Sequence, residues 1–279
     1  MIVAKSLAEF QAAYEALPNK SDIGFVPTMG ALHEGHLSLI RRSVAENTST
    51  IISIFVNPTQ FNNPNDLATY PRTLETDCTL VEPVGVDIVF APQVHDIYPE
   101  PDQRIFNLGG LDRFGEGPRR PGHFNGVAQV VTRLFNLVRP TRSYFGEKDF
   151  QQLAILRFVT EDLQLPVEII GCPIARAEDG LALSSRNTLL TPSQREAAPH
   201  IYRCICQART WMHECTPAET IQRITDAIHT NPELETEYIE IFNARTLEPV
   251  ENWDDAAEIQ LGCAIFAHPV RLIDNIKLK

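Results

Sequence analysis

Two histidines with a glycine between them mark the first candidate site in this sequence. His33 and His36 belong to the run PTMGALHEGH, residues 27–36. The apolar stretch Ile23 to Val26 predicts a strand before this run, and apolar residues at helical spacing follow it. A helix that begins directly after a strand offers unpaired N–H groups and a partial positive charge to a phosphate, and Gly35 lets the phosphate approach the backbone closely. The spacing therefore predicts a nucleotide-phosphate site.

Two other interpretations of this run stay open. The run could be a glycine-bearing turn that carries two surface histidines. A zinc site is less favoured, because H-E-x-H is one residue shorter than the helical H-E-x-x-H pair of zinc enzymes. H-x-G-H after the first strand of an α/β protein is more typical of nucleotidyl transfer.

A second polar run, GEKDFQQ, occupies residues 146–152 and also lies between an expected strand and an expected helix. Lys148 would present a compact cation at the carboxyl edge of the sheet, where α/β folds bind ligands. The alternative is structural, because Asp149 at a helix N-cap and Gln152 three residues later would form a capping box. Both can hold at once, since Asp149 could cap the helix and still face a ribose.

Two further loops carry side chains suited to anionic or hydroxylated ligands. The run LSSRN, residues 183–187, places two hydroxyls before Arg186, which suits a polyphosphate clamp on a mobile lid. The run NPTQFNN, residues 57–63, follows the second apolar strand, and its Gln60 can both donate to and accept from a hydroxy acid. Taken alone, these runs also fit a serine-rich turn and an ordinary polar loop.

The stretch RFGEGPRRPGH, residues 113–123, is basic and contains several Gly and Pro residues. A solvated loop is its default interpretation, and a substrate-gating role is the alternative. Neither G-x-G-x-x-G nor a Walker A motif occurs in the sequence, so dinucleotide binding and P-loop chemistry are not supported.

Composition limits the partners. The net charge of −12 argues against a large nucleic-acid or anionic-membrane surface, so an anionic substrate must meet a local basic patch. The six cysteines are scattered without C-x-x-C spacing, which favours free thiols in a reducing compartment. No basic n-region with an apolar run opens the chain, and no stretch approaches the ~20 apolar residues of a membrane span. A cytoplasmic protein is expected.

The elements that must position these residues follow from hydrophobic periodicity. Continuous apolar runs predict buried strands, and longer runs with apolar residues on one side predict helices. Strands are expected at residues 23–26, 51–56, 86–90, 143–145 and 167–172, with helices at 127–138 and 149–163. This alternation predicts an α/β fold, a Rossmann-like parallel sheet with helices on both faces.

The C-terminal third has a different order. Helices are expected at residues 192–214 and 217–229, followed by strands at 237–242, 259–266 and 270–276 with no helix between them. This order predicts a smaller α+β lid domain with an antiparallel sheet. We place the Rossmann-like catalytic domain at residues 1–176 and the lid domain at 177–279.

Taken together, these runs resemble the pantoate–β-alanine ligase (pantothenate synthetase) family of the H-x-G-H nucleotidyltransferase superfamily. The similarity covers essentially the whole chain. GEKDFQQ together with ALSSRN is more specific to this family than H-x-G-H, which occurs across a wide superfamily. It rests on PTMGALHEGH (27–36), FVNPTQFN (55–62), RPGHFNGVA (120–128), YFGEKDFQQL (144–153), LSSRN (183–187) and RLIDN (271–275).

The resemblance implies a ligase that joins pantoate to β-alanine through a pantoyl-adenylate, releasing pyrophosphate and AMP, with Mg²⁺ accompanying ATP. His33, His36 and Lys148 would act at the α-phosphate, while Gln60 and Gln152 would hold pantoate, with Gln60 also near β-alanine. Ala175, smaller than the branched residue expected there, would back the adenine. The implied ATP-binding residues are Met29, Gly30, Ala31, Leu32, His33, Glu34, Gly35, His36, Gly146, Glu147, Lys148, Asp149, Ala175, Leu183, Ser184, Ser185 and Arg186.

The same superfamily leaves other functions to weigh. An adenylyltransferase would retain AMP in a dinucleotide-type product, whereas the ligase releases it. A synthetase that binds tRNA is disfavoured by the net charge, and a non-catalytic sensor by the presence of Lys148 and both histidines. The family also implies a homodimer with small-molecule partners only, whereas protein ligands for Mg²⁺ are not identifiable from sequence.

Overall fold

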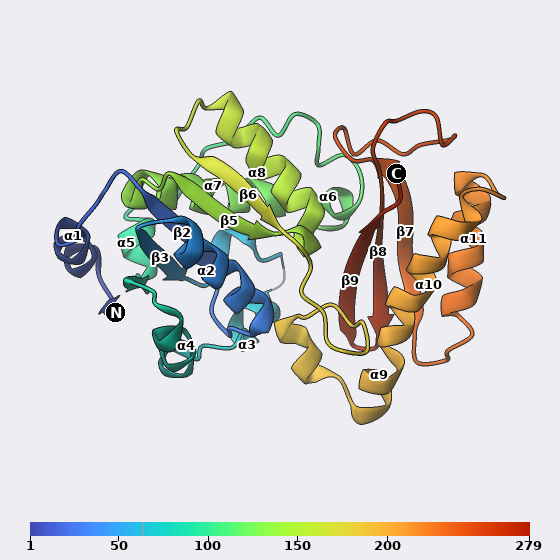
Figure 1. Cartoon of the computed structure of the whole chain (residues 1–279), viewed down its shortest axis with the longest axis horizontal. Coiled ribbons are helices and arrows are strands. Elements are labelled where there is room, and N and C mark those ends of the chain that lie inside the picture. The colour runs from blue at the N-terminus through green and yellow to red at the C-terminus, as the bar shows by residue number, and fades with distance from the viewer. Residues whose placement is uncertain (63) are drawn as a thin grey trace. The chain divides into compact units, whose positions relative to one another are not determined.

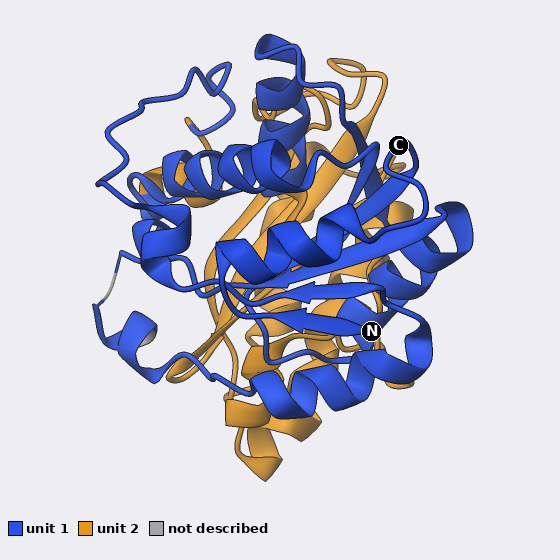
Figure 2. Cartoon of the chain, turned by 90° about the vertical axis from the view of Figure 1, so that its left-hand side faces the viewer, with its two compact units in different colours: residues 1–112, 119–147, 152–173 blue, residues 113–118, 148–151, 174–279 orange. Residues whose placement is uncertain are grey.

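A computed structural model describes residues 1–62 and 64–279, apart from the side chain of Asp66. The described chain forms two compact units, coloured separately in Figure 2. Unit 1 comprises Met1–Asp112, Arg119–Glu147 and Gln152–Pro173, and unit 2 comprises Arg113–Pro118, Lys148–Gln151 and Ile174–Lys279. Three short segments that the sequence-based division placed in the first domain, 113–118, 148–151 and 174–176, therefore belong to unit 2. The boundary between residues 176 and 177 stays a prediction.

Unit 1 contains a six-stranded parallel sheet with strand order β1-β4-β3-β2-β5-β6 (Figure 1). Its strands are β1 (Ile2–Ala4), β2 (Ile23–Thr28), β3 (Ser49–Ile54), β4 (Ile88–Phe90), β5 (Arg142–Gly146) and β6 (Glu168–Cys172). Its helices are α1 (Leu7–Glu15), α2 (Glu34–Glu46), α3 (Pro64–Thr69), α4 (Leu74–Val81), α5 (Val94–Ile97), α7 (His123–Val138) and, from its second turn onward, α8 (Phe150–Asp162).

Apolar strand residues of this sheet alternate between two buried layers. Phe25 packs with side chains of α1, α7 and α8, whereas Val26 packs with side chains of α2 and α4. Because both faces are covered, the strands are continuous apolar runs, as predicted for a parallel sheet.

The order of strands marks where a ligand can bind. β2 and β5 are hydrogen-bonded neighbours, yet the helices that follow them, α2 and α8, contribute to opposite apolar layers. Such a topological switch point, at the carboxyl ends of the strands, is where doubly wound sheets bind their ligands. The histidine run and Gly146 lie at these two strand ends.

A buried tyrosine secures the far end of α2. The hydroxyl of Tyr144, in β5, donates to Glu46 at 3.0 Å and accepts from Asn47 at 2.7 Å. Burial raises the pKa of Tyr144 to about 12, so the hydroxyl keeps its proton at neutral pH. These bonds fix the C-terminal end of α2 to β5, the strand next to β2.

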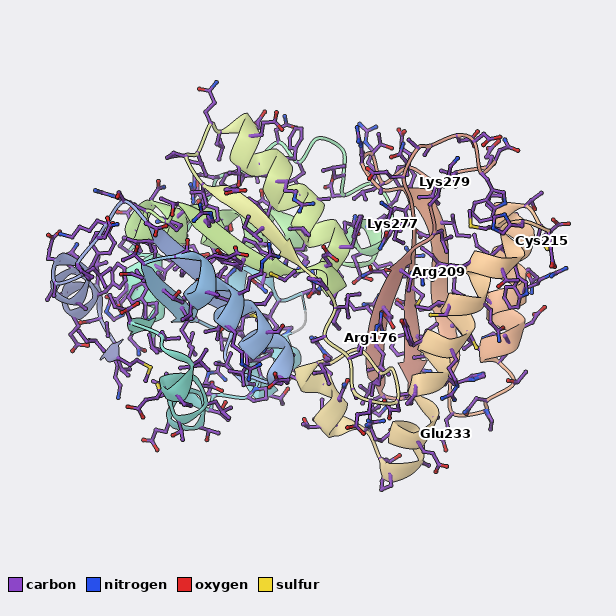
Figure 3. All side chains as sticks on the ribbon, in the orientation of Figure 1. Arg176, Arg209, Cys215, Glu233, Lys277 and Lys279 are labelled. Atoms are coloured by element: carbon purple, nitrogen blue, oxygen red, sulfur yellow. The ribbon has the colours of Figure 1, made fainter. Side chains whose placement is uncertain are left out.

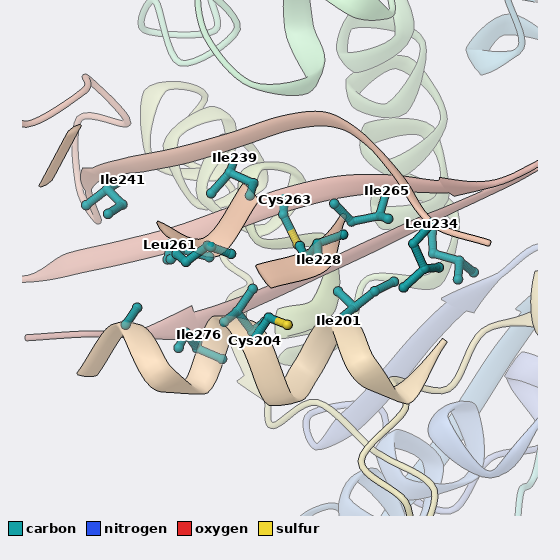
Figure 4. Close-up of a cluster of buried hydrophobic side chains, with 14 of the residues drawn as sticks. Ile201, Cys204, Ile228, Leu234, Ile239, Ile241, Leu261, Cys263, Ile265 and Ile276 are labelled. Atoms are coloured by element: carbon teal, nitrogen blue, oxygen red, sulfur yellow. The ribbon is translucent and has the colours of Figure 1, made fainter. Parts of the chain in front are cut away.

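Unit 2 is built around an antiparallel sheet of three strands, β7 (Glu235–Asn243), β8 (Ile259–Ala267) and β9 (Val270–Lys277). Its helices are α6 (Glu116–Arg119), α9 (Pro192–Ala197), α10 (Pro199–Trp211) and α11 (Pro217–Ile228), with Arg119 of α6 assigned to unit 1. Figure 4 shows the apolar side chains between α10 and the strands, including Ile201, Ile265 and Ile276.

The predicted fold class is confirmed, and two of the differences in its elements have a clear physical reason. The single helix expected over residues 192–214 is two helices, because Pro199 has no N–H to donate and begins α10 at its first position. Strand β1 was not predicted, since three residues at a sheet edge leave too short a pattern. No helix among the described residues has the length and apolar character needed to cross a bilayer.

Candidate active site

The loop between β2 and α2 is shaped by a buried aspartate from α4. Gly30 and Ala31 adopt positive φ angles of 81° and 50°. The carboxylate of Asp77, 1% exposed, accepts the N–H groups of Ala31 at 3.0 Å and Leu32 at 2.8 Å, and the hydroxyl of Thr73 at 3.1 Å. These bonds hold a backbone conformation that an alanine rarely adopts, and such strain is typical of ligand-binding loops.

The two histidines cap the helix that they begin. His33 is the N-cap of α2, and its Nδ1 accepts the N–H of Gly35 at 3.1 Å. Nδ1 of His36 accepts the N–H of His33 at 3.3 Å, and the ring centroids lie 4.1 Å apart. Because both Nδ1 atoms accept, each neutral ring carries its proton on Nε2. The pair therefore presents two N–H donors at a helix N-terminus, which suits a phosphate.

Glu34 follows the N-cap and carries an acidic side chain. It forms an ion pair with Arg41, and the hydrogen bonds from this guanidinium lower the pKa of Glu34. A carboxylate would repel a phosphate, so any contact of Glu34 with a phosphate must come from its backbone N–H.

Gln60 ends the short 3-10 turn Pro58–Gln60 that follows β3. Its Oε1 accepts from Asn57 at 3.1 Å, and its Nε2 lies 3.2 Å from the sulfur of Met29. Asn57 is 1% exposed and accepts the hydroxyl proton of Tyr98 at 2.9 Å, and burial raises the pKa of Tyr98. The amide of Gln60 is thus oriented by a buried chain of hydrogen bonds. Asn63, which ends the predicted run, lies outside the described residues.

Helix α7 supports the same turn through its first two turns. Nδ1 of His123 lies 2.8 Å from the carbonyl oxygen of Gln60, and Asn57 donates to the carbonyl of Gly126 at 3.2 Å. A Cβ added to Gly126 would come within 2.4 Å of the carbonyl oxygen of Thr59. Only glycine permits this close approach at position 126. The bond of His123 to Gln60 means that the last residue of the basic stretch 113–123 helps to hold the Gln60 turn.

Lys148 and its neighbours lie in unit 2. The segment is the 3-10 turn Glu147–Asp149, followed at once by α8, and the carbonyl of Lys148 accepts from Asn275 of β9 at 2.9 Å. The predicted capping box of Asp149 and Gln152 is wrong, because Asp149 lies within a continuous run of helical backbone and not at an extended N-cap. Asp149 is exposed and Gln152 is half-buried.

The run LSSRN forms a capped 3-10 helix, Ser185–Leu189, in unit 2. The hydroxyl of Ser184 accepts the N–H of Arg186 at 3.2 Å, so this serine acts as an N-cap. Leu183 donates its N–H to the carbonyl of Ala175 at 2.9 Å, which pairs the start of this run with the predicted adenine-binding residue. The turn interpretation therefore holds for Ser184. The contact of Ser185 and Arg186 with the outer phosphates of ATP stays a prediction.

Arg176, labelled in Figure 3, begins the hairpin that leads to this run. Its guanidinium forms two 2.7 Å bonds with Asp274 of β9 and stacks at 3.7 Å on the ring of Tyr202. Asp274 and the adjacent Asn275 therefore anchor both the hairpin and the Lys148 turn. Sequence reasoning included these two residues in the RLIDN run but assigned them no role.

Within residues 1–62 and 64–279, no group of three or more His, Cys, Asp or Glu is placed to hold a metal ion. Asp77, the buried carboxylate beside the histidine loop, already accepts three protein donors and does not fit as an Mg²⁺ ligand.

Comparison with known proteins gives a consistent result. The family model described as pantoate-beta-alanine ligase matches residues 2–277. Pantothenate synthetase from Bacteroides fragilis is 51% identical over 281 residues, covering 100% of this chain and 99% of its own. The crystal structure of pantothenate synthetase from Thermus thermophilus superposes with a TM-score of 0.92 at 44% identity, covering 100% of this chain and 99% of that one.

A third relative was crystallised with ligands. Pantoate-beta-alanine ligase from Francisella tularensis, complexed with beta-gamma ATP and β-alanine, is 37% identical, with a TM-score of 0.83 and coverage of 100% of this chain and 98% of that one. The family match spans both units, including the histidine turn, the Gln60 turn and the Lys148 turn. The chain belongs to the pantoate–β-alanine ligase family.

Proposed function

We propose that this enzyme condenses (R)-pantoate with β-alanine at the expense of ATP, giving pantothenate, AMP and pyrophosphate. The observation that carries the proposal is the family match over residues 2–277. The two histidines at the start of α2, at the switch point of a parallel sheet, give it a physical basis. The alternative of an adenylyltransferase has no such support from the relatives.

The reaction has two steps. A carboxylate oxygen of pantoate attacks the α-phosphorus of ATP, and the bond to the bridging oxygen breaks, releasing pyrophosphate. The amine of β-alanine then attacks the acyl carbon, the bond to AMP breaks, and the amine loses its proton. The first step brings two anions together, so positioning and electrostatic stabilisation carry its rate.

Unit 1 supplies the residues for the first contacts in this proposal. The Nε2–H groups of His33 and His36 and the backbone of residues 29–36 would bind ATP phosphates. The oriented amide of Gln60, together with Gln152, would hold the carboxylate and hydroxyls of pantoate. The hydrogen bonds from Asn57 to Gln60 support this role, because a fixed amide loses little entropy on binding.

Unit 2 supplies the cationic groups. Lys148 would stabilise negative charge that develops on the α-phosphate, and Ser185 and Arg186 would hold the outer phosphates. Asp149, together with Gly146 of unit 1, would contact the ribose of the nucleotide, and Ala175 would back the adenine. Mg²⁺ prefers phosphate oxygens and water as ligands, so it belongs to the MgATP substrate in this scheme.

We further propose that the enzyme acts in the cytoplasm as a homodimer. The family resemblance is the support for both statements. Light scattering of the purified protein tests the second, and a mass of one chain at working concentrations would contradict it.

Product analysis tests the proposed reaction directly. With ATP and pantoate alone, we expect one pyrophosphate for each pantoyl-adenylate formed. On addition of β-alanine, free AMP and pantothenate should appear in equal amounts. Detection of ADP and phosphate in place of AMP and pyrophosphate would contradict the adenylate mechanism.

The pantoate assignment predicts a selective binding defect. We expect Gln60→Ala and Gln152→Ala each to weaken pantoate binding by roughly 5- to 150-fold, because an unpaired buried hydroxyl costs about 1–3 kcal/mol. Affinity for ATP should change little, and the exposed Gln222→Ala should behave as wild type. Titration calorimetry with each substrate measures both quantities. Loss of ATP binding with pantoate binding retained would exclude the assignment.

A further inference from the structure

Three residues of one short segment are anchored within unit 2, two to its sheet and one to a loop. In the segment 148–151, the carbonyl of Lys148 accepts from Asn275 of β9, and the ring of Phe150 lies 5.8 Å from that of Phe242 in β7. Gln151 bonds to the loop 113–118, donating to the carbonyl of Phe114 at 2.9 Å and accepting the N–H of Glu116 at 2.9 Å. The turn that carries Lys148 is thus held from both ends.

The loop 113–118 is in turn fixed by a buried carboxylate. The side chain of Glu116 is 11% exposed and accepts two hydrogen bonds from Arg271 of β9, at 2.9 and 2.7 Å. It also accepts the hydroxyl proton of Tyr238 at 2.6 Å, and burial raises the pKa of this tyrosine. Arg271 pairs with Glu237 as well, at 2.7 Å.

Partly buried charges of this kind contribute little to net stability, because desolvation offsets their attraction. Removing one partner is nevertheless costly, since it leaves an uncompensated charge. Such networks are therefore better suited to fixing one conformation than to stabilising the fold. Here the network fixes the conformation of the segment 148–151. Because the side chain of Lys148 is flexible, the position of its ammonium group depends on where its backbone is held.

We propose that Glu116, Arg271 and Gln151 are positioning residues for Lys148, holding the segment 148–151 so that its ammonium group is placed for adenylate formation. The inference rests on the proposed role of Lys148 in that step. It assigns the acidic residue of a basic loop, and an arginine 123 positions after the lysine, to the first half-reaction.

Glu116→Gln tests the proposal in the full-length enzyme. The variant keeps the size of the side chain but turns an amide N–H toward the donors of Arg271 and Tyr238. We expect the single-turnover rate of pyrophosphate release with ATP and pantoate to fall roughly 10- to 100-fold, the loss typical of a small misplacement. Amide formation from supplied pantoyl-adenylate and β-alanine should stay within about threefold of wild type.

A double-mutant cycle separates positioning from general destabilisation. In a Lys148→Ala background, Glu116→Gln should slow pyrophosphate release by less than about threefold further, because the group that it positions is already absent. Gln151→Leu removes both bonds to the loop 113–118 and leaves the ion pair of Glu116 with Arg271 intact. It should give the same pattern of rates, and it serves as the test if Glu116→Gln fails to fold. The control is a variant of the apolar core of unit 2, either Ile224→Val or Ile224→Ala. Whichever of the two lowers the melting temperature as much as Glu116→Gln does should keep the wild-type rate of pyrophosphate release.

The outcomes distinguish this inference from the function on which it rests. Wild-type rates in folded Glu116→Gln and Gln151→Leu, with Lys148→Ala slow, would overturn the inference alone. Equal slowing of pyrophosphate release by Glu116→Gln in both backgrounds would also overturn it. A Lys148→Ala enzyme with the wild-type rate of adenylate formation would overturn the role of Lys148 and the inference with it.

Discussion

Lys148→Ala should slow pantoyl-adenylate formation by at least about 10²–10³-fold, with only a modest loss of ATP affinity. Negative charge builds on the α-phosphate as the carboxylate adds, so a cation aimed there stabilises the transition state more than bound ATP. Loss of one preorganised donor of this kind typically costs on the order of 10²–10³ in rate. Single-turnover release of pyrophosphate, with equilibrium binding of ATP measured separately, checks both parts of the expectation.

The second half-reaction provides the internal comparison for Lys148. Amide formation from supplied pantoyl-adenylate should suffer much less, because the bond to the leaving pyrophosphate is already broken. Lys277→Ala is a matched control, since this exposed lysine of β9, labelled in Figure 3, pairs only weakly with Glu258 at 3.4 Å. Equal slowing of both steps, or a loss confined to amide formation, would contradict the role given to Lys148.

His36→Ala should have a comparable effect on the first step, for two reasons that can be separated. The variant removes the Nε2–H donor and also the Nδ1 acceptor that completes the capping box at the start of α2. We expect adenylate formation to slow by about 10²–10³-fold, and the free energy of unfolding to fall by about 0.5–2 kcal/mol through loss of the cap. Single-turnover kinetics and denaturant titration measure these quantities.

His36→Gln separates the two contributions. Glutamine is a favoured third residue of a capping box, so its side chain can still reach back to the N–H of His33. Stability should therefore return to nearly that of wild type while the rate of adenylate formation stays low. Recovery of the rate together with the stability would mean that His36 serves only as a helix cap.

Much of the fold could be predicted because local pattern carries it. The run 51–56 is apolar except for Ser53, which predicts a strand covered on both faces, and the structure has β3 at Ser49–Ile54 with both faces covered. Pro217 at the first helical position, with Thr216 as the N-cap before it, likewise marks the start of α11. The prediction of one helix over residues 192–214 is wrong, because Pro199 begins a second helix although the apolar periodicity continues past it.

Local pattern also predicts the main candidate site residues. His33, His36, Gln60 and Lys148 stand out because each lies just after an apolar strand in a short polar run, and the carboxyl ends of parallel strands meet at one edge. The tautomer of the two histidines is also decided locally, by N–H groups within three residues.

The residues that hold this site in place depend on tertiary structure. Asp77 fixes the histidine loop from 45 and 46 positions away, Asn57 meets the carbonyl of Gly126 across 69, and Arg271 meets Glu116 across 155. Sequence alone predicts which residues could do the chemistry, because that prediction depends on residue type and short-range spacing. Only the folded chain decided which buried polar groups position them, because a hydrogen bond between distant segments leaves no periodicity in the sequence of either one.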